Sequence, residues 1–264
     1  RQQFTPEGST LILTGDLDTH TARQTVEDAL GDWQGGEAKP AKPIRNDAQG
    51  ETRVILVDRK DAAQTTLRLG HPSIPRTHPD FGALQVLNSL LGGKFTSRIN
   101  LKLREELGIT YGANSSFSTR LGPGPFQVAA DVDSEGAGIG IREIIGELHR
   151  LQDERVDEAE LEDTKSYLLG VFPYPLQRID GLASRLADLG VANLPDDYFD
   201  QQLDVIRAVD PQTLQELAQR HLQPTRLSIV AVGPAEALQP QLEAFGTVSL
   251  TAPTDVISAV DALD

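Results

Sequence analysis

The chain has 264 residues, contains neither cysteine nor methionine, and carries 39 acidic against 24 basic side chains, which gives a formal net charge of −15. Its hydrophobic fraction of 39% is that of a globular protein large enough to bury a core. The lack of cysteine excludes disulfides, thiolate nucleophiles and cysteine-ligated zinc. Because the acidic surplus would repel phosphate backbones and anionic lipids, we expect no nucleic acid partner.

Neither a membrane span nor a leader is expected in this stretch of sequence. No uninterrupted apolar run reaches spanning length, and no basic segment precedes an apolar one at the start. The chain begins with Arg1 rather than with an initiator methionine. We therefore expect it to be a piece of a longer protein.

The first and last parts of the chain share one pattern, in which a strand is followed by a glycine turn and a helix. The first copy has a strand at Thr10–Leu13, a turn at Gly15 and a helix capped near Asp18 or Thr19. The second copy has a strand at Leu227–Val232, a turn at Gly233 and a helix from Pro234 to about Phe245. Two copies about one domain apart predict a repeated domain. Residues 1–33 are then the last strand and helix of a preceding domain, 34–50 a Gly- and Pro-rich linker, and 51–264 a C-terminal domain.

Between these ends, strands gather into hairpins and helices into runs. Strands are predicted at Thr52–Val57, Thr65–Leu69, Ile109–Phe117 and Phe126–Val132, and helices at 80–91, 97–107 and over much of 139–220. Gly92 and Gly93 should end the first helix, and Gly108 should end the second in a left-handed conformation. This order predicts an α+β fold, a mixed, mainly antiparallel sheet with helices packed on one face.

The familiar catalytic motifs are absent from the sequence. None of the five histidines belongs to HExxH or HxxEH, and most of them are expected to be ordinary surface or turn residues. No serine lies in a GxSxG elbow. The acidic run from Asp153 to Asp163 is expected to form a solvated helix face.

A nucleotide-binding turn at Gly136–Gly140 is a remote alternative. A strand precedes these glycines and a helix follows, but their spacing is GxGxG rather than GxGxxG, and the next segment is helical where a second parallel strand is required. An ordinary strand-to-helix loop is the favoured interpretation.

Arg104 and Tyr111 stand seven residues apart across the predicted helix-to-strand corner. A guanidinium offers a fixed fork of donors and a phenol one directional donor, so the pair could hold the carbonyl groups of a bound peptide. In the alternative interpretation, Arg104 pairs with a neighbouring carboxylate and Tyr111 packs as one more alternating strand residue.

The segment Leu87–Phe117, LNSLLGGKFTSRINLKLREELGITYGANSSF, resembles the insulinase, pitrilysin and mitochondrial processing peptidase family of zinc metallopeptidases, known as M16. The shared pattern is a leucine-rich helix, paired glycines, Ser-Arg, LRE, a glycine and a tyrosine. The resemblance implies an M16 domain with the LuxS/MPP-like fold, specifically the C-terminal domain that lacks HxxEH. It also implies that Tyr111 stabilises the oxyanion and that Arg104 holds a substrate carbonyl oxygen.

The resemblance further implies a peptide substrate and a partner M16 domain or subunit that bears HxxEH. The full protein would be a homo- or heterodimer in the bacterial cytoplasm or periplasm. No cofactor is expected in this chain, because zinc would lie in the missing N-terminal half or in the partner, and this chain alone should be inactive. The alternatives are a non-catalytic assembly subunit of an M16 complex and, remotely, the nucleotide-binding module.

Overall fold

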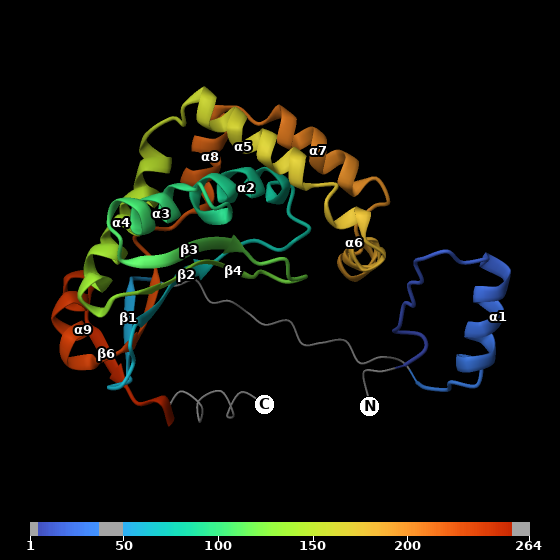
Figure 1. The fold of residues 1–264 in the computed structure, drawn as a ribbon, viewed down its shortest axis with the longest axis horizontal. Coiled ribbons are helices and arrows are strands. Elements are labelled where there is room, and N and C mark those ends of the chain that lie inside the picture. Colours follow the sequence, from blue (N-terminus) through green and yellow to red (C-terminus); the bar gives the residue numbers. More distant parts are fainter. Residues whose placement is uncertain (1–4, 37–49, 255–264) are drawn as a thin grey trace. The chain divides into compact units, whose positions relative to one another are not determined.

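The computed structural model describes residues 5–36 and 50–254 (Figure 1). These residues fall into two compact units, one made of 5–36 with 169–201 and the other of 50–168 with 202–254. The second unit contains the β-sheet and the corner that carries Arg104 and Tyr111. The predicted division into 1–33, 34–50 and 51–264 stays a prediction, and most of its linker, 37–49, lies outside the described residues.

The described helices and strands alternate irregularly along the chain. The strands are β1 (Arg53–Asp58), β2 (Thr65–Pro72), β3 (Thr110–Phe117), β4 (Pro125–Val132), β5 (Ser228–Gly233) and β6 (Val248–Thr251). The α-helices are α1 (Thr19–Leu30), α2 (Phe81–Asn88), α3 (Arg98–Asn100), α4 (Ala137–Asp153), α5 (Glu158–Val171), α6 (Ile179–Ala192), α7 (Tyr198–Ala208), α8 (Pro211–His221) and α9 (Ala235–Leu242). Two π-helical turns, Ser89–Gly93 and Leu101–Glu106, extend α2 and α3.

The six described strands form one sheet in the order β3-β4-β2-β5-β1-β6. β1 runs parallel to β5 and β6, whereas the β2–β4, β2–β5 and β3–β4 pairs are antiparallel. The β3–β4 pair confirms the predicted hairpin, and the overall pattern confirms a mixed, mainly antiparallel sheet.

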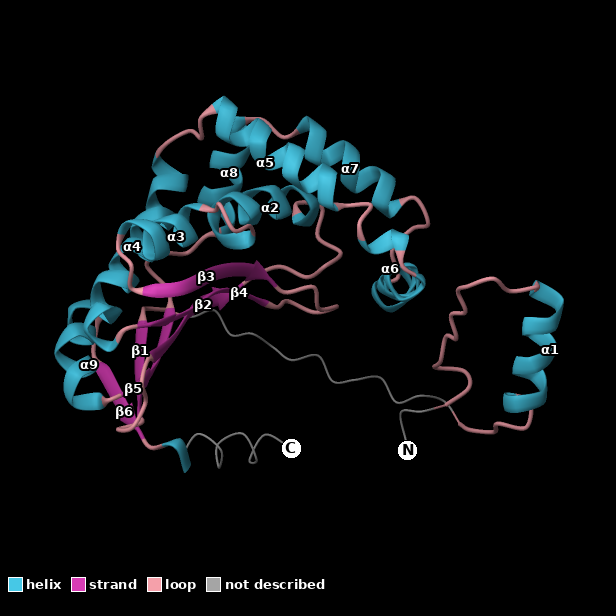
Figure 2. Cartoon of the chain, viewed as in Figure 1, coloured by secondary structure: helices cyan, strands magenta, loops and turns pink. Residues whose placement is uncertain are grey.

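The helices of this unit cover one face of the sheet (Figure 2). Residues alternate between buried and half-buried positions along β2 and β5, as expected when only one face is covered. The buried face contributes Leu56, Leu67, Leu69 and Ile229, and the helices contribute Phe81, Leu84, Leu87, Leu103 and Ile141. The predicted fold class is therefore confirmed.

In the N-terminal unit, one prediction is confirmed and one is wrong. The Asp18 side chain caps α1 by accepting from the Thr21 backbone N–H at 2.7 Å, as the capping signal indicated. Residues 10–13, however, form no strand. A strand needs a neighbouring backbone to pair with, and Leu11 and Leu13 remain 55% and 50% exposed in the described residues.

Candidate functional site

The corner between α2 and β3 is built by close backbone approach. A Cβ at Gly92 would lie 2.6 Å from the Ser115 backbone nitrogen, so the first π-helical turn can pass β3 only with glycine there. Asn88 supports the same contact by accepting from the Ser115 hydroxyl at 2.8 Å. Gly108 has φ +64°, which confirms the predicted left-handed end of the second helical segment.

A β-bulge at the start of β3 displaces Tyr111 from the strand alternation. The pairing moves from Thr110 opposite Val132 to Ala113 opposite Ala130, so β3 contains one more residue than β4 over this interval. Thr110 is buried and Tyr111 is 89% exposed. A period-two alternation continued back from Ala113 would place Tyr111 on the buried face, but the extra residue in the bulge turns the phenol outward.

Side chains hold the bulge from within. The Thr110 hydroxyl lies 2.6 Å from the Asp131 carbonyl oxygen and 2.9 Å from the Gly112 carbonyl oxygen, and it accepts from the Gly112 N–H at 3.1 Å. Asn100 lies on the other side of the bulge and is 4% exposed. Its Oδ1 accepts from the Ala113 N–H at 2.9 Å, while its Nδ2 donates to the Phe95 carbonyl oxygen at 2.6 Å.

Sequence reasoning missed Asn100. A usable signal was present, because Asn100 precedes Leu103 by three residues and so falls near the buried stripe of its helix. A polar side chain at a buried position requires hydrogen-bond partners, which would have identified it as a clamp.

Arg104 points to the same corner from the second π-helical turn. Its guanidinium carbon lies 4.4 Å from the centre of the Phe95 ring, a cation–π distance, and Phe95 is 65% exposed. The neighbouring carboxylate is Glu105, but the Nε to Oε1 distance of 3.6 Å is longer than a hydrogen bond. The buried Nη1 has no hydrogen-bond partner in the described part of the chain. No close carboxylate therefore commits Arg104, and its side chain is 34% exposed.

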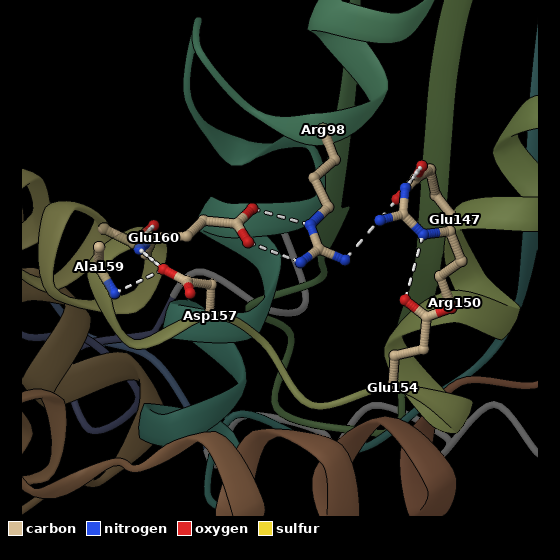
Figure 3. A network of polar contacts seen from close by, with 8 residues as sticks. Arg98, Glu147, Arg150, Glu154, Asp157, Ala159 and Glu160 are labelled. Atoms are coloured by element: carbon tan, nitrogen blue, oxygen red, sulfur yellow. Dashed lines mark hydrogen bonds and ion pairs between the residues drawn. The ribbon is translucent and has the colours of Figure 1, made fainter.

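An ion-pair network anchors the helix that leads to this corner (Figure 3). Arg98 binds Glu160 with two hydrogen bonds, from Nε at 2.8 Å and from Nη2 at 2.6 Å, and its Nη1 lies 3.8 Å from Glu147. Burial disfavours the charge on Arg98, but the hydrogen bonds to Glu160 outweigh it and raise the pKa of the guanidinium. Lys94 pairs with Asp163 at 2.6 Å. The acidic run is therefore not simply a solvated face, because it anchors two cations.

The one group of three potential metal ligands found in residues 5–36 and 50–254 is His78, Asp80 and His221. Their ligand atoms lie within 4.8 Å of one another. The same Asp80 oxygen already accepts from His221 Nε2 at 2.6 Å and from Arg220 Nη1 at 2.7 Å. A guanidinium on that oxygen repels a cation, so these residues do not fit a catalytic zinc ion.

The hydrogen bonds of Asp80 tie the start of α2 to the end of α8. Burial opposes ionisation of Asp80, but the hydrogen bonds from His221 and Arg220 outweigh it and lower the pKa of the carboxyl group. His221 and His71, which are 8% and 2% exposed, are exceptions to the expectation that most histidines are surface or turn residues. His71 accepts from the Gln223 N–H at 3.2 Å.

The glycines at the start of α4 are packed against other side chains. The Gly138 N–H donates to Gln241 Oε1 at 2.8 Å, and a Cβ at Gly136 would lie 2.9 Å from Ile109. A phosphate would have to displace Gln241 to reach the Gly138 amide. These contacts favour the ordinary strand-to-helix loop.

Comparison with known proteins gives consistent matches. A family model described as the Peptidase M16 inactive domain matches residues 1–168. An uncharacterized zinc protease of Mycobacterium tuberculosis is 26% identical over 237 residues, which cover 88% of this chain and 53% of that protein. A non-peptidase homolog of Helicobacter pylori is 22% identical over 227 residues, which cover 84% and 51%. The chain thus spans about half the length of these curated relatives.

The fold is also found among solved structures. The M16 inactive domain from Pseudomonas fluorescens superposes with a TM-score of 0.73 at 24% identity, covering 83% of this chain and 52% of that chain. No helix within the described ranges is long and apolar enough to cross a membrane. Since the family model matches well over half of the sequence, the chain belongs to the M16 peptidase family and corresponds to its inactive C-terminal domain.

Proposed function

We propose that this domain binds peptide substrate and supports the transition state in a peptidase chamber whose zinc ion lies in another M16 domain or subunit. The observation that carries the proposal is the outward position of Tyr111, which is 89% exposed on a bulge fixed by buried hydrogen bonds. A large aromatic side chain is normally placed in a core or an interface. Its exposure on a rigid backbone is what a ligand-facing donor requires.

The roles of the two residues follow from their donors. When a peptide carbonyl is attacked, negative charge develops on its oxygen, and the Tyr111 hydroxyl can donate a hydrogen bond to it. The Arg104 guanidinium can donate to a second carbonyl oxygen of the same peptide and so fix its position. We expect the zinc ion in another M16 domain or subunit, because Arg220 already donates to the Asp80 oxygen of the group of three potential ligands found among the described residues.

The test is Tyr111→Phe in the complete peptidase, formed by this domain and its zinc-bearing partner. Removing one oxyanion donor should lower kcat by about 100- to 1,000-fold, with the zinc content unchanged. Tyr174, which is 71% exposed in the other compact unit, provides the matched control, and Tyr174→Phe should leave kcat unchanged. Peptide cleavage by Tyr111→Phe at the wild-type rate would refute the role of the phenol.

A second candidate function is a non-catalytic assembly subunit. It is favoured by the Helicobacter pylori relative, which is described as a non-peptidase homolog. In that case the complex would form normally, contain no competent zinc site and cleave no peptide. Zinc analysis and a cleavage assay on the purified complex distinguish the two functions.

A further inference from the structure

The corner contains one buried side chain that forms hydrogen bonds both on the side of Arg104 and on the side of Tyr111. Asn100 donates to the carbonyl oxygen of Phe95, whose ring lies against Arg104, and accepts from the N–H of Ala113, which closes the bulge bearing Tyr111. The two hydrogen bonds measure 2.6 and 2.9 Å. Asparagine offers a donor and an acceptor on one planar group, so each end is matched to one neighbour.

We infer that Asn100 is a positioning residue that fixes the Arg104 side and the Tyr111 side of the site as one rigid unit. This inference rests on the proposed function of that site. Asn100 is only 4% exposed, so it acts through the residues it holds rather than by touching substrate.

The physical need for such a clamp comes from the bulge itself. A bulge interrupts the ladder of backbone hydrogen bonds and leaves one residue unpaired with the neighbouring strand. Here the Ala113 N–H is turned away from β4 and is satisfied by Asn100 Oδ1. Without this acceptor, a nearly buried donor would be left unpaired, and the strand could relax towards another geometry. Tyr111 would then lose its fixed direction.

The same side chain sets the position of the turn that precedes α3. Phe95 lies between the end of the first π-helical turn and the start of α3, and its ring is largely exposed. The hydrogen bond from Asn100 Nδ2 fixes the backbone at Phe95 and thereby the surface on which the Arg104 guanidinium lies. A displacement of about 1 Å in such a site can cost on the order of 100-fold in rate.

The experiment compares Asn100→Leu with Asn100→Asp in the complete peptidase. Leucine fills a similar volume but removes both hydrogen bonds, so kcat should fall about 10- to 100-fold. Aspartate retains an acceptor for the Ala113 N–H, so it should recover part of that loss. Hydrogen exchange at the Ala113 amide should be faster in Asn100→Leu than in Asn100→Asp.

A matched control separates positioning from general stability. Gln241 also uses both ends of a planar amide, because its Oε1 accepts from the Gly138 N–H and its Nε2 donates to the Ser134 carbonyl oxygen, away from the bulge. Gln241→Leu should weaken the fold and leave kcat at the wild-type value below the melting temperature. Equal losses of kcat in Gln241→Leu and Asn100→Leu would overturn the inference.

A double variant links the two proposals and keeps them distinguishable. If Asn100 acts through Tyr111, adding Asn100→Leu to Tyr111→Phe should lower kcat by less than about twofold more. Independent, multiplicative losses would overturn the positioning role while leaving the role of Tyr111 intact. If Tyr111→Phe alone leaves kcat unchanged, the proposed function is wrong. Separately, an unchanged rate of amide hydrogen exchange at Ala113 in Asn100→Leu would show that Asn100 does not hold the bulge.

Discussion

Arg98 and Arg104 lie six residues apart in one helical segment, yet their surroundings are opposite. The Arg98 side chain is 16% exposed and makes two short hydrogen bonds to Glu160. The Arg104 side chain is 34% exposed, lies on an aromatic ring, and is 3.6 Å from its nearest carboxylate. A carboxylate partner commits an arginine to the fold, whereas an aromatic partner supports it and leaves its donors free.

The largest effect on stability is expected from Arg98→Ala. This change leaves Glu160 without its cation and removes the more distant of the two arginines beside the buried Glu147, which keeps its contact with Arg150 at 2.7 Å. The free energy of unfolding should fall by about 3 kcal/mol. Urea denaturation measures the loss. Arg207→Ala removes an exposed pair with Asp204 and should cost less than about 1 kcal/mol. Equal losses in the two variants would mean that the Arg98 network does not anchor the helix.

Asp80 tests whether a carboxylate shared by an arginine and a histidine behaves like Glu160. Asp80→Asn should lower stability by about 2 kcal/mol at pH 7, because the carboxylate accepts from both His221 and Arg220. The folded-state pKa of Asp80 is lowered, so its contribution is present above the unfolded pKa and is lost as pH falls through the folded value.

The pH dependence supplies the control for Asp80. The free energy of unfolding of the wild type and of Asp80→Asn should be measured from pH 7 to below pH 4, because about 4 is the ordinary pKa of an aspartate. The two stability curves should converge in acid. A gap that persists unchanged below the folded pKa would show that the charge of Asp80 is not what stabilises the link between α2 and α8.

Arg104→Ala should show the reverse pattern to Arg98→Ala. The peptide KM should rise about tenfold, the order of one charge-assisted hydrogen bond, while stability changes by less than about 1 kcal/mol. Arg104→Lys keeps the charge but not the planar fork, so it should recover only part of the affinity. If Arg104→Ala unfolded readily but kept the wild-type KM, Arg104 would stabilise the fold, as Arg98 does, rather than bind peptide.

The smallest effect is expected from Asp163→Asn. Asp163 is 73% exposed although its partner Lys94 is 5% exposed, and exposed carboxylates in such pairs contribute less than about 1 kcal/mol. The loss should be smaller at high salt. A loss of stability as large as that in Arg98→Ala would contradict the distinction between the two pairs. Arg98 makes two hydrogen bonds to Glu160, whereas Lys94 makes a single contact with an exposed carboxylate.

The parts of the fold that local sequence determines were predictable. Paired glycines end a helix, Gly108 fits a left-handed cap, and apolar residues at helical spacing mark the buried face around Leu103. The family resemblance also pointed to Arg104 and Tyr111.

The bulge, and the partners of Asn100 across it, could not be predicted in the same way. Alternation has period two, and an extra residue in β3 breaks it without leaving a local signal. The choice between bulged and regular pairing depends on Asn100 and Thr110, which meet the strand only in the folded state. The Arg98–Glu160 pair likewise joins residues 62 positions apart, beyond the reach of a periodicity argument.

The single extra residue in β3 also makes the side chain at position 111 independent of the packing of the core. Downstream of the bulge, Ala113 to Phe117 keep a regular register with β4, and their inward and outward assignments do not depend on which residue occupies position 111. The side chain at position 111 can therefore be replaced without repacking the sheet. Removing Gly112 would restore regular pairing and place Tyr111 opposite the exposed Asp131, so the length of this strand, as much as its composition, determines whether Tyr111 lies in a bulge or in the regular ladder.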